Sequence, residues 1–274
     1  MKIILSRKGF DSDMGGHPSP IINKKIISMP IPEENGNYSY NELQIDSNLI
    51  KQLYNNFDLK RKCHLDPDIN KAILKNRPKN WKALFGQTGN AQSHLQNENQ
   101  DIKKNDIFLF FGWFRKTERT KNKIIFTGPD MHVIFGYFQI DKILKVKDIQ
   151  WNKENEWMKY HDHINEKYIN NERNTIYVAK ERLSFNKKLL GAGIFDYNKN
   201  LVLTKNGYLR SRWELPKIFK SVNITYHSKN SWKISKKTGE EYFQSAGRGQ
   251  EFVIEKNKRI KEWAINLIND CIPL

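Results

Sequence analysis

The sequence predicts an α+β fold built on a mixed, strongly twisted central sheet or partly open barrel with surrounding helices. Residues 107–115 and 131–141 are long aromatic and β-branched runs, which are typical of strands buried on both faces. Residues 261–272 place apolar side chains at helical spacing. No internal repeat or low-complexity linker interrupts the chain, so we expect one domain over residues 1–274.

The first third of the chain predicts short elements. Residues 2–5 are an apolar strand that leads into a polar loop, and residues 26–31 form a second short strand closed by prolines. Residues 38–43 and 49–57 carry helical spacing. Asp66 and Asp68 flank Pro67, and two interpretations stay open: a divalent-ion or sugar-hydroxyl ligand, or Asp68 as the cap of a helix that begins near Ile69.

Further along, the pattern predicts mainly strands. Residues 116–123 are a basic loop between the two long aromatic runs. His161 and His163 flank Asp162, and with no clear third ligand nearby we expect a structural or acid/base role rather than a zinc site. Short strands are expected within residues 174–179, 189–195, 201–216 and 224–228.

The charge balance points to a polyanionic partner. Lys and Arg number 47 and Asp and Glu 30, which gives a net charge of +17. Such a basic chain is typical of a nucleic-acid binder, although an AT-rich coding bias also enriches Lys, Asn and Ile. We therefore expect DNA or a modified nucleotide as partner, and the sequence names no protein partner.

Cellular location follows from absences. The two cysteines, Cys63 and Cys271, are too few for a disulfide scaffold or a cysteine zinc site. No signal-like region opens the sequence and no apolar run approaches the ~18 residues of a membrane helix. We expect a cytoplasmic protein without a membrane partner. Phosphate-binding loops, dinucleotide fingerprints, zinc-protease helices and serine-hydrolase elbows are missing from the sequence.

Three glycine-bounded polar stretches supply the candidate site, and we expect them to converge on one cavity beside the sheet. The first, residues 6–20, follows the first strand and is rich in hydroxyls, cations and carboxylates suited to binding an anion. The second, residues 81–97, lines up amides that can read base edges. The third, residues 245–254, presents a guanidinium, an amide and a carboxylate from a tight turn. The structural alternatives are an ordinary polar turn for the first stretch, a Gln/Asn-rich surface helix for the second and a hairpin turn with an incidental Arg for the third.

Ordered segments across nearly the whole chain resemble one family. They are SRKGFDSDMGGHPSPI, HLDPDI, ALFGQTGNAQSHL, NDIFLFFGWFR, PDMHVIFGYFQI, NTIYVA, GAGIF, RSRWELP and AGRGQEFV. With these segments the chain resembles the nucleotide modification associated domain 3 family of bacteria and phages. The resemblance implies an association with DNA base modification and a setting in anti-phage defence. Residues 104–144 also look like the strand pair of PUA-like barrels that cradle modified bases.

The combined expectation is a hydrolase that acts on DNA or nucleotides with a modified base, most readily by cleaving the N-glycosidic bond. A non-catalytic reader of modified bases and a Mg²⁺-dependent nuclease are the alternatives, and only the nuclease needs a cofactor, with Asp11, Asp66 and Glu251 around the ion. Apart from that arrangement and the alternative left open for Asp66 and Asp68, no metal ligand is predicted. The expected catalytic residues are Asp11, His94, His132 and Glu251. The expected substrate-binding residues are Ser6, Arg7, Lys8, Ser12, Gln87, Gln92, Trp113, Arg248 and Gln250.

Overall fold

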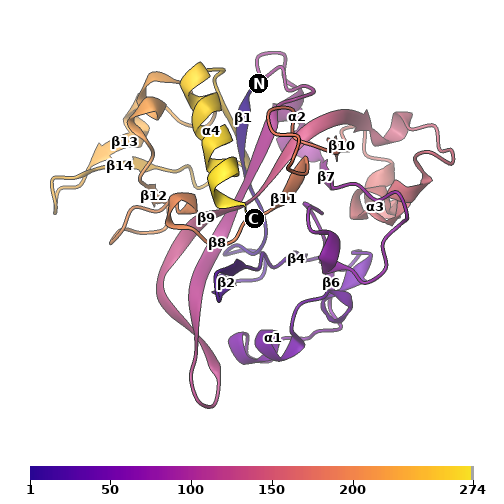
Figure 1. Cartoon of the computed structure of the whole chain (residues 1–274), viewed down its shortest axis with the longest axis horizontal. Helices are drawn as coiled ribbons and strands as arrows, with labels where there is room; N and C mark the ends of the chain where they lie inside the picture. Colours follow the sequence, from indigo (N-terminus) through magenta and orange to yellow (C-terminus); the bar gives the residue numbers. More distant parts are fainter. Residues whose placement is uncertain (273–274) are drawn as a thin grey trace.

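The computed structural model describes residues 1–272, and a mixed sheet forms its centre (Figure 1). β1 runs parallel to β8, whereas the other neighbours along the main path are antiparallel. This confirms the predicted α+β class with a mixed sheet. In order across the sheet, the strands are β15 (Glu251–Ile254), β1 (Ile3–Arg7), β8 (Ile107–Arg119), β9 (Ile124–Lys145), β10 (Thr175–Ala179) and β7 (Leu84–Gln87).

The sheet curls strongly without closing. Phe85 on the edge strand β7 lies 4.8 Å from Phe108 and 5.2 Å from Phe110, measured between ring centroids. Both partners are on β8, and β9 and β10 lie between β8 and β7 in the strand order. Within residues 1–272, β7 and β15 are not hydrogen-bonded as strands, so the sheet is an open half-barrel. Its resemblance to PUA-like barrels stays a prediction.

Smaller strands surround this sheet. β2 pairs with β8 and β3, and β11 pairs with β9, while two three-stranded sheets lie apart from it, in the orders β12-β14-β13 and β4-β6-β5. Their bounds are β2 (Ser19–Ile22), β3 (Lys25–Ile26), β4 (Ile31–Pro32), β5 (Tyr38–Ser39), β6 (Lys62–His64), β11 (Ala192–Ile194), β12 (Arg212–Trp213), β13 (Trp232–Ile234) and β14 (Glu241–Gln244).

The β8–β9 hairpin is longer than the sequence pattern predicted. The expected loop at residues 116–123 is wrong over its first half, because the ladder continues from Lys116 opposite Thr127 to Arg119 opposite Ile124. Only residues 120–123 form the turn. The hairpin projects away from the rest of the molecule at the lower edge of Figure 1.

Four α-helices accompany the strands within residues 1–272: α1 (Ser47–Leu53), α2 (Gly89–Gln96), α3 (Glu166–Ile169) and α4 (Lys258–Cys271). α4 lies across the central strands (Figure 1) and buries Ile260, Ala264 and Ile268 against them. The Asn257 side chain accepts the backbone N–H groups of Arg259 and Ile260, which caps the helix. No helix among the described residues is both long and apolar enough to cross a bilayer.

Three local predictions were wrong. Asp68 caps no helix: the 3₁₀ turn Lys71–Ile73 is capped by Asn70, and Asp68 binds Arg77 instead. Residues 224–228 make only the isolated bridge between Ile224 and Ile254, because Tyr226 has a φ of 64° and leaves the extended conformation. Residues 38–43 divide into β5 and the 3₁₀ turn Tyr40–Glu42.

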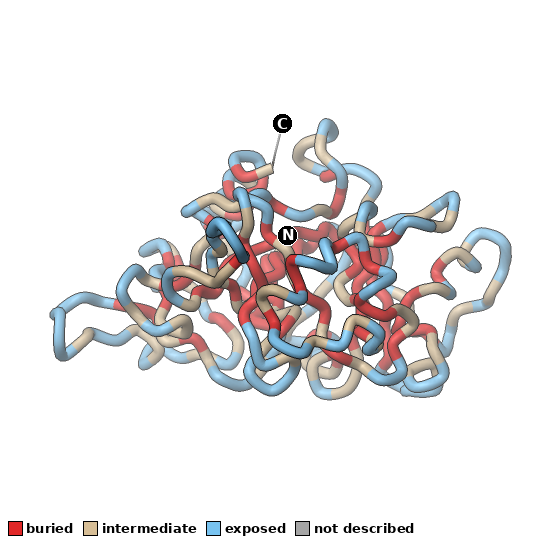
Figure 2. The backbone as a smooth tube through the Cα atoms, turned by 90° about the horizontal axis from the view of Figure 1, so that it is seen from below, coloured by how far each residue is buried: buried red, intermediate tan, exposed pale blue. Residues whose placement is uncertain are grey.

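The buried residues form one large core and two smaller ones, and buried backbone runs through the middle of the molecule (Figure 2). Phe108, Phe110, Phe111 and Phe138 fill the main core along β8 and β9. A second core packs beneath β4, β5 and α1, and a third lies beneath β10. The space between the main sheet and the second core holds the pocket described below.

Candidate functional site

β1 and β15 bring two side chains onto one carboxylate. Ser6 lies opposite Glu251 in the antiparallel register, and its hydroxyl donates to Glu251 Oε1 at 3.0 Å. Lys8, on the same face of the chain two residues later, places its Nζ 3.2 Å from the same oxygen. The Lys8 side chain is 10% exposed and that of Glu251 0%, so this ion pair is buried.

The opposite edge of the sheet supplies the next partner. Gln87, the last residue of β7, donates from Nε2 to Glu251 Oε1 at 2.7 Å. Gln250 lies beside it, with 3.4 Å between Gln87 Nε2 and Gln250 Oε1. Glu251 Oε2 is buried and has no hydrogen-bond partner within residues 1–272. One oxygen of the carboxylate is therefore held by three groups, and the other keeps its acceptor capacity.

A buried, incompletely satisfied charge of this kind is costly. Removing a carboxylate and an ammonium from water costs several kcal/mol each, which their attraction only partly offsets. Lys8 gains some compensation because its Nζ lies 4.6 Å from the centroid of the Phe85 ring. Unpaired buried polar atoms are uncommon in folded proteins and concentrate at functional sites. The Lys8–Glu251 pair is therefore the first candidate for chemistry.

Two histidines and a carboxylate gather next to this pair. His64 ends β6, Asp66 follows it, and His163 lies on the 3₁₀ turn Asp162–Ile164. One nitrogen of each histidine and one oxygen of Asp66 all lie within 4.8 Å of one another. The backbone N–H of Gly86 donates to Asp66 Oδ1 at 2.7 Å, which ties this cluster to β7. We call His64, Asp66 and His163 the histidine–aspartate cluster.

Burial and neighbouring charges set the protonation states in this cluster. Burial lowers the pKa of His163 to about 4, and it also lowers the pKa of His64 well below its ordinary value. Burial opposes ionisation of Asp66, but the interaction with His161, whose Nε2 lies 3.5 Å from Oδ1, and the charge of Lys8 hold the pKa of Asp66 below its usual range. At neutral pH both imidazoles are therefore neutral and the carboxylate is ionised.

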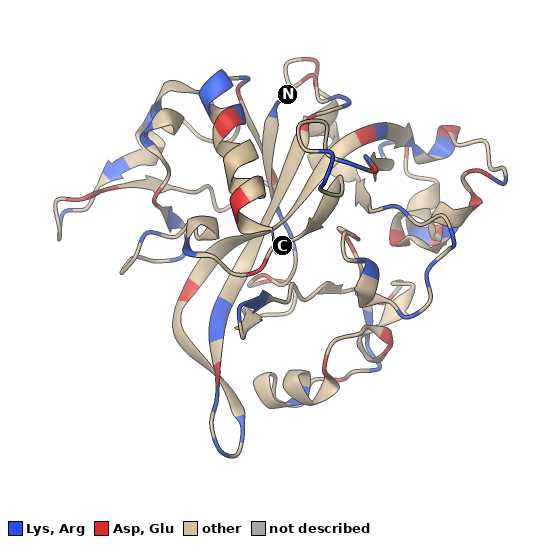
Figure 3. Cartoon of the chain, in the orientation of Figure 1, with Lys and Arg blue, Asp and Glu red and all other residues tan. Residues whose placement is uncertain are grey.

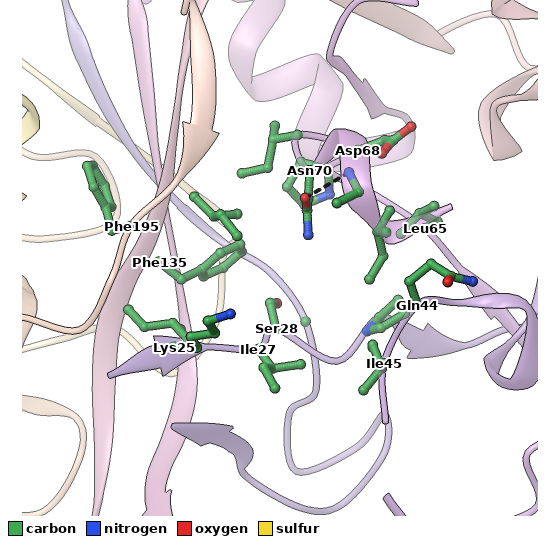
Figure 4. A pocket seen from close by; sticks show the side chains of 18 of the residues that line it. Lys25, Ile27, Ser28, Gln44, Ile45, Leu65, Asp68, Asn70, Phe135 and Phe195 are labelled. Carbon is green, nitrogen blue, oxygen red and sulfur yellow. Dashed lines mark hydrogen bonds between the residues drawn. The ribbon is translucent and has the colours of Figure 1, made fainter. Parts of the chain in front are cut away.

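A pocket of about 390 Å³ opens beside the cluster (Figure 4). Asp66 and Gly9, the residue after Lys8, are part of its wall. Most of the lining is apolar and includes Phe135 and Phe195, and Ser28, Lys25 and Gln44 add polar groups. Asp68 also borders the pocket, but Arg77 grips both its oxygens and the Tyr160 hydroxyl donates to it at 2.8 Å. Asp68 is thus committed to structure, while Asp66 reaches both the pocket and the cluster.

Other predicted site residues gather on the opposite face of β1. Arg7 points away from Ser6 and Lys8, lies over the rings of Phe111 and Phe252, and donates to the carbonyl oxygens of Ala246 and Gly247. Arg210 lies 4.0 Å from the centroid of the Trp113 ring and donates to Ser12. The two guanidinium groups form a second polar group of residues, separated by the sheet from Glu251.

Asp11 and His132 also belong to that second face. Asp11 Oδ1 accepts the backbone N–H groups of Asp13 and Met14 at 2.9 and 2.7 Å, so the carboxylate shapes its own turn. His132 is buried and its Nδ1 accepts the indole N–H of Trp213 at 3.0 Å. Burial, together with the charges of Arg7 and Arg210, lowers the pKa of His132 well below its ordinary value.

The remaining predicted residues lie around Glu251 or at the surface. His94 Nε2 is 3.0 Å from Thr225 Oγ1, and burial lowers the pKa of His94 while the charge of Glu251 raises it. Gln92 is fully buried and accepts the hydroxyl of Tyr177. Arg248 is exposed and makes no hydrogen bond or ion pair with any residue the structure describes. The three polar stretches therefore meet through Ser6, Lys8, Gln87, Gln250 and Glu251, without Asp11 or Arg248. The single cavity expected between them was wrong, because none of these five residues lines the pocket beside Asp66.

Sequence reasoning missed the histidine–aspartate cluster as a unit. It singled out Asp66 and His163 in separate stretches but found no partner for either, since almost 100 residues separate them. A usable signal was present: His64-x-Asp66 and His161-x-His163 both repeat ligand-type residues at the spacing of two that places side chains on one face of an extended chain.

Comparison with protein families gives one match. Residues 2–255 match the family model described as nucleotide modification associated domain 3. The chain belongs to this family. The predicted resemblance is confirmed, and a role associated with nucleotide modification follows from the family's description. The matched range includes every residue of the Lys8–Glu251 pair and of the histidine–aspartate cluster, and it ends before α4 begins. Searches of curated proteins and of solved structures found no match.

Proposed function

We propose that this member of the nucleotide modification associated domain 3 family is a hydrolase that cleaves the N-glycosidic bond of a modified base in DNA or in a nucleotide. The observation that carries the proposal is the buried Lys8–Glu251 pair, in which Ser6 and Gln87 hold one carboxylate oxygen and the other has no partner within residues 1–272. An ionised, rigidly held carboxylate is the group that glycosidic hydrolysis requires.

Glu251 takes the role of the water-positioning base. Its Oε2 accepts a proton from water, the water oxygen bonds to the sugar C1′, and the C1′–N bond breaks with its electron pair leaving on the base. The departing base takes up a proton from solvent. Lys8 pairs with Glu251 at 3.2 Å, and Gln87 fixes the orientation of the carboxylate. Glu251 is preferred to Asp11 for this role because the carboxylate of Asp11 is engaged by the backbone of its own turn.

The neighbouring pocket suits a base. Its volume of about 390 Å³ is within the range of small-ligand sites, and its apolar walls with a few polar groups match a flat heterocycle with hydrogen-bonding edges. Gly9, which follows Lys8 in the sequence, is part of the pocket wall, whereas the side chains of Lys8 and Glu251 are not. The net charge of +17 favours a polyanionic substrate such as DNA over a neutral nucleoside.

A magnesium nuclease receives less support. The sequence-based arrangement required Asp11, Asp66 and Glu251 around one ion, and Asp11 lies with Arg7 on the far face of β1. The carboxylates of Asp66 and Glu251 are each held by other groups, the backbone N–H of Gly86 and Lys8 respectively.

Product analysis tests the proposal. The protein is incubated with oligonucleotides that carry modified bases and with plain oligonucleotides, and released bases are separated by chromatography. We expect free modified base, and strand breaks only after alkali. Breaks without alkali would instead indicate a nuclease, and tight binding without any product would indicate a reader.

Separate substitutions of Glu251 and Asp11 show which of the two carboxylates acts as the base. Glu251→Gln keeps the shape of the side chain and should lower the rate of base release by about 100-fold or more, since a positioned base contributes on that scale. Glu154→Gln, at an exposed position, is the matched control and should keep full activity. Loss of activity in Asp11→Asn but not in Glu251→Gln would overturn the assignment. Circular dichroism of each variant checks that it is folded.

A further inference from the structure

The histidine–aspartate cluster has the composition of a metal site. We propose that His64, Asp66 and His163 bind one divalent transition-metal ion, with open coordination positions facing the pocket. Two imidazoles and one carboxylate are a donor set found in zinc and non-haem iron enzymes, whereas Mg²⁺ prefers oxygen ligands. The inference stands on the geometry of this cluster and does not depend on glycosidic cleavage being the reaction.

The hydrogen bonds of His163 leave its outer nitrogen free for a ligand. Asn174 donates from Nδ2 to the carbonyl oxygens of His163 and Tyr168, so its Oδ1 is an acceptor. The Nδ1–H of His163 donates to that oxygen at 2.8 Å. The proton is therefore on Nδ1 and the lone pair on Nε2, and an orienting hydrogen bond of this kind accompanies nearly all metal-bound histidines.

His64 and Asp66 are also arranged in a way that suits metal binding. His64 is buried, and its Nδ1 has no hydrogen-bond partner among residues 1–272, which is costly unless a ligand fills the position. Asp66 Oδ1 is oriented by the backbone N–H of Gly86 at 2.7 Å and lies 3.5 Å from Nε2 of His161. Because His161 Nδ1 accepts the backbone N–H of His163, its proton is on Nε2 and faces Asp66.

The space around the cluster also fits an ion that reacts with a bound molecule. A Cβ at Gly86 would lie 2.1 Å from Cδ2 of His163, so glycine is needed for the ring to reach this position. Asp66 borders the pocket, whereas His64 and His163 are not part of its lining, so the pocket meets the site on the Asp66 side. Three protein ligands with an open position are the pattern of catalytic rather than structural zinc.

Metal binding requires the three ligand side chains to move slightly closer together, and the positive charge of Lys8 opposes it. The ligand atoms lie within 4.8 Å of one another, compared with roughly 3.3 Å around tetrahedral zinc, so small side-chain rotations bring the widest pairs to that separation. Lys8 repels a cation here, because its charge acts on His64, Asp66 and His163 alike. Its ion pair with Glu251 offsets that repulsion.

Metal titration of the chelator-treated, full-length protein tests the proposal. Co²⁺ is added as a visible probe for the zinc-type site, and Zn²⁺ is used to displace it. We expect one equivalent of Co²⁺ with absorption bands of a four- or five-coordinate ion and an increase in melting temperature. Asp66→Asn and His163→Gln should abolish these bands, and Asn174→Ala should weaken binding by about 10- to 100-fold. His132→Gln, equally buried but outside the cluster, should bind normally.

X-ray absorption spectroscopy of the Zn²⁺-loaded wild-type protein identifies the metal ligands without any variant, so it tests the proposal even if a variant does not fold. The expected first shell holds nitrogen and oxygen at about 2.0–2.1 Å, with two imidazoles and no sulfur. Failure of the wild-type protein to bind either ion at micromolar concentration would overturn the proposal. A sulfur ligand from nearby Cys63, or equal loss of binding in His132→Gln, would overturn it as well.

Discussion

Gly86 shows how one missing side chain shapes the site. The strand β7 runs so close to His163 that a Cβ at residue 86 would overlap the imidazole ring. We expect Gly86→Ala to lower the free energy of unfolding by about 1–3 kcal/mol, as overpacking usually does. The displaced ring should also lose its position in the histidine–aspartate cluster. Urea unfolding and the Co²⁺ titration measure the two effects.

Gly247→Ala is the control for that substitution, because a Cβ there meets nothing within 4 Å and φ is not positive. Unchanged stability in Gly86→Ala, or equal destabilisation in both variants, would contradict the packing argument.

His227 makes the stability depend on pH. Its Nε2 accepts the backbone N–H of Ala246 at 2.9 Å, so the ring must be neutral to keep this contact. Burial lowers the pKa of His227, the hydrogen bond to the carbonyl of Thr225 opposes that shift, and the charge of Arg7 adds to it. The unfolded chain therefore binds the proton more readily. The contribution to stability is complete above an unfolded pKa of 6.5 and is lost as the pH falls from there through the lower folded value.

We expect the free energy of unfolding to decline between about pH 7.5 and pH 5.5, and to decline less steeply in His227→Gln. Buried His64, His132 and His163 keep part of the slope, because burial lowers their pKa values too. His17→Gln, at an exposed position, should retain the wild-type slope. Chemical denaturation at a series of pH values provides the comparison, and parallel curves for wild type and His227→Gln would refute the role of His227.

Among single residues, sequence reasoning succeeded where chemistry and strand alternation agree. Ser6, on β1, and Lys8, directly after the end of β1, share one face because they are two residues apart, and both contact Glu251. The same alternation turns Arg7 to the other face of β1. The prediction that Arg7 binds substrate together with Ser6 and Lys8 did not take this alternation into account. The spacing of two within each segment marks His64 with Asp66 and His161 with His163, but pairing Asp66 with His163 required knowledge of long-range packing.

At the level of elements, α4 shows a helix that supports the sheet from outside the family match. Leu267 is 6% exposed and belongs to the main core. Leu267→Ala should lower the free energy of unfolding by about 2–5 kcal/mol, through lost burial and the cavity left behind. Base release and metal binding by the folded protein should not change, since the site residues lie elsewhere.

Lys261→Ala, on the exposed face of α4, is the matched control and should be close to neutral. Denaturant unfolding followed by circular dichroism measures both variants. Equal, small effects for the two would mean that α4 is not an integral part of the core.

Helices and strands were predictable where their apolar residues follow the pattern of only one type of element. We predicted β8 and β9 because strands buried on both faces are continuous aromatic and aliphatic runs. We predicted α4 because a helix buried along one stripe has apolar residues at helical spacing. The helix expected near Ile69 was wrong because the capping carboxylate of Asp68 is engaged by Arg77, a tertiary contact that outweighs local propensity. Residues 224–228 failed as a strand because Tyr226 adopts positive φ.

For the molecule as a whole, the excess of positive charge is its most general property. In Figure 3 the blue Lys and Arg positions are distributed over many elements of the ribbon, and some of them lie near the end of the projecting β8–β9 hairpin. Arg119, Lys121 and Lys123 are exposed there. If this tip contacts DNA phosphates, substituting all three by Gln should weaken binding and reduce the slope of log affinity against log salt by up to about 3.

The matched control removes the same charge from α4, with Lys258, Arg259 and Lys261 changed to Gln. Fluorescence anisotropy with duplex DNA at several salt concentrations measures both variants. Identical losses from the two triple substitutions would show that total charge, and not the hairpin tip, governs DNA affinity.

The curl of the sheet carries one last consequence. Gln87 and Glu251 belong to strands at opposite margins of the same sheet, and a single 2.7 Å contact joins them. Flattening the sheet by a few ångströms would pull the amide from the carboxylate and leave Lys8 as its main support. A ligand that moves β7 away from β15 would therefore lengthen the hydrogen bond between Gln87 and Glu251, and a ligand that draws the two strands together would shorten it. The curvature of the sheet and the position of the Glu251 carboxylate are therefore linked through Gln87.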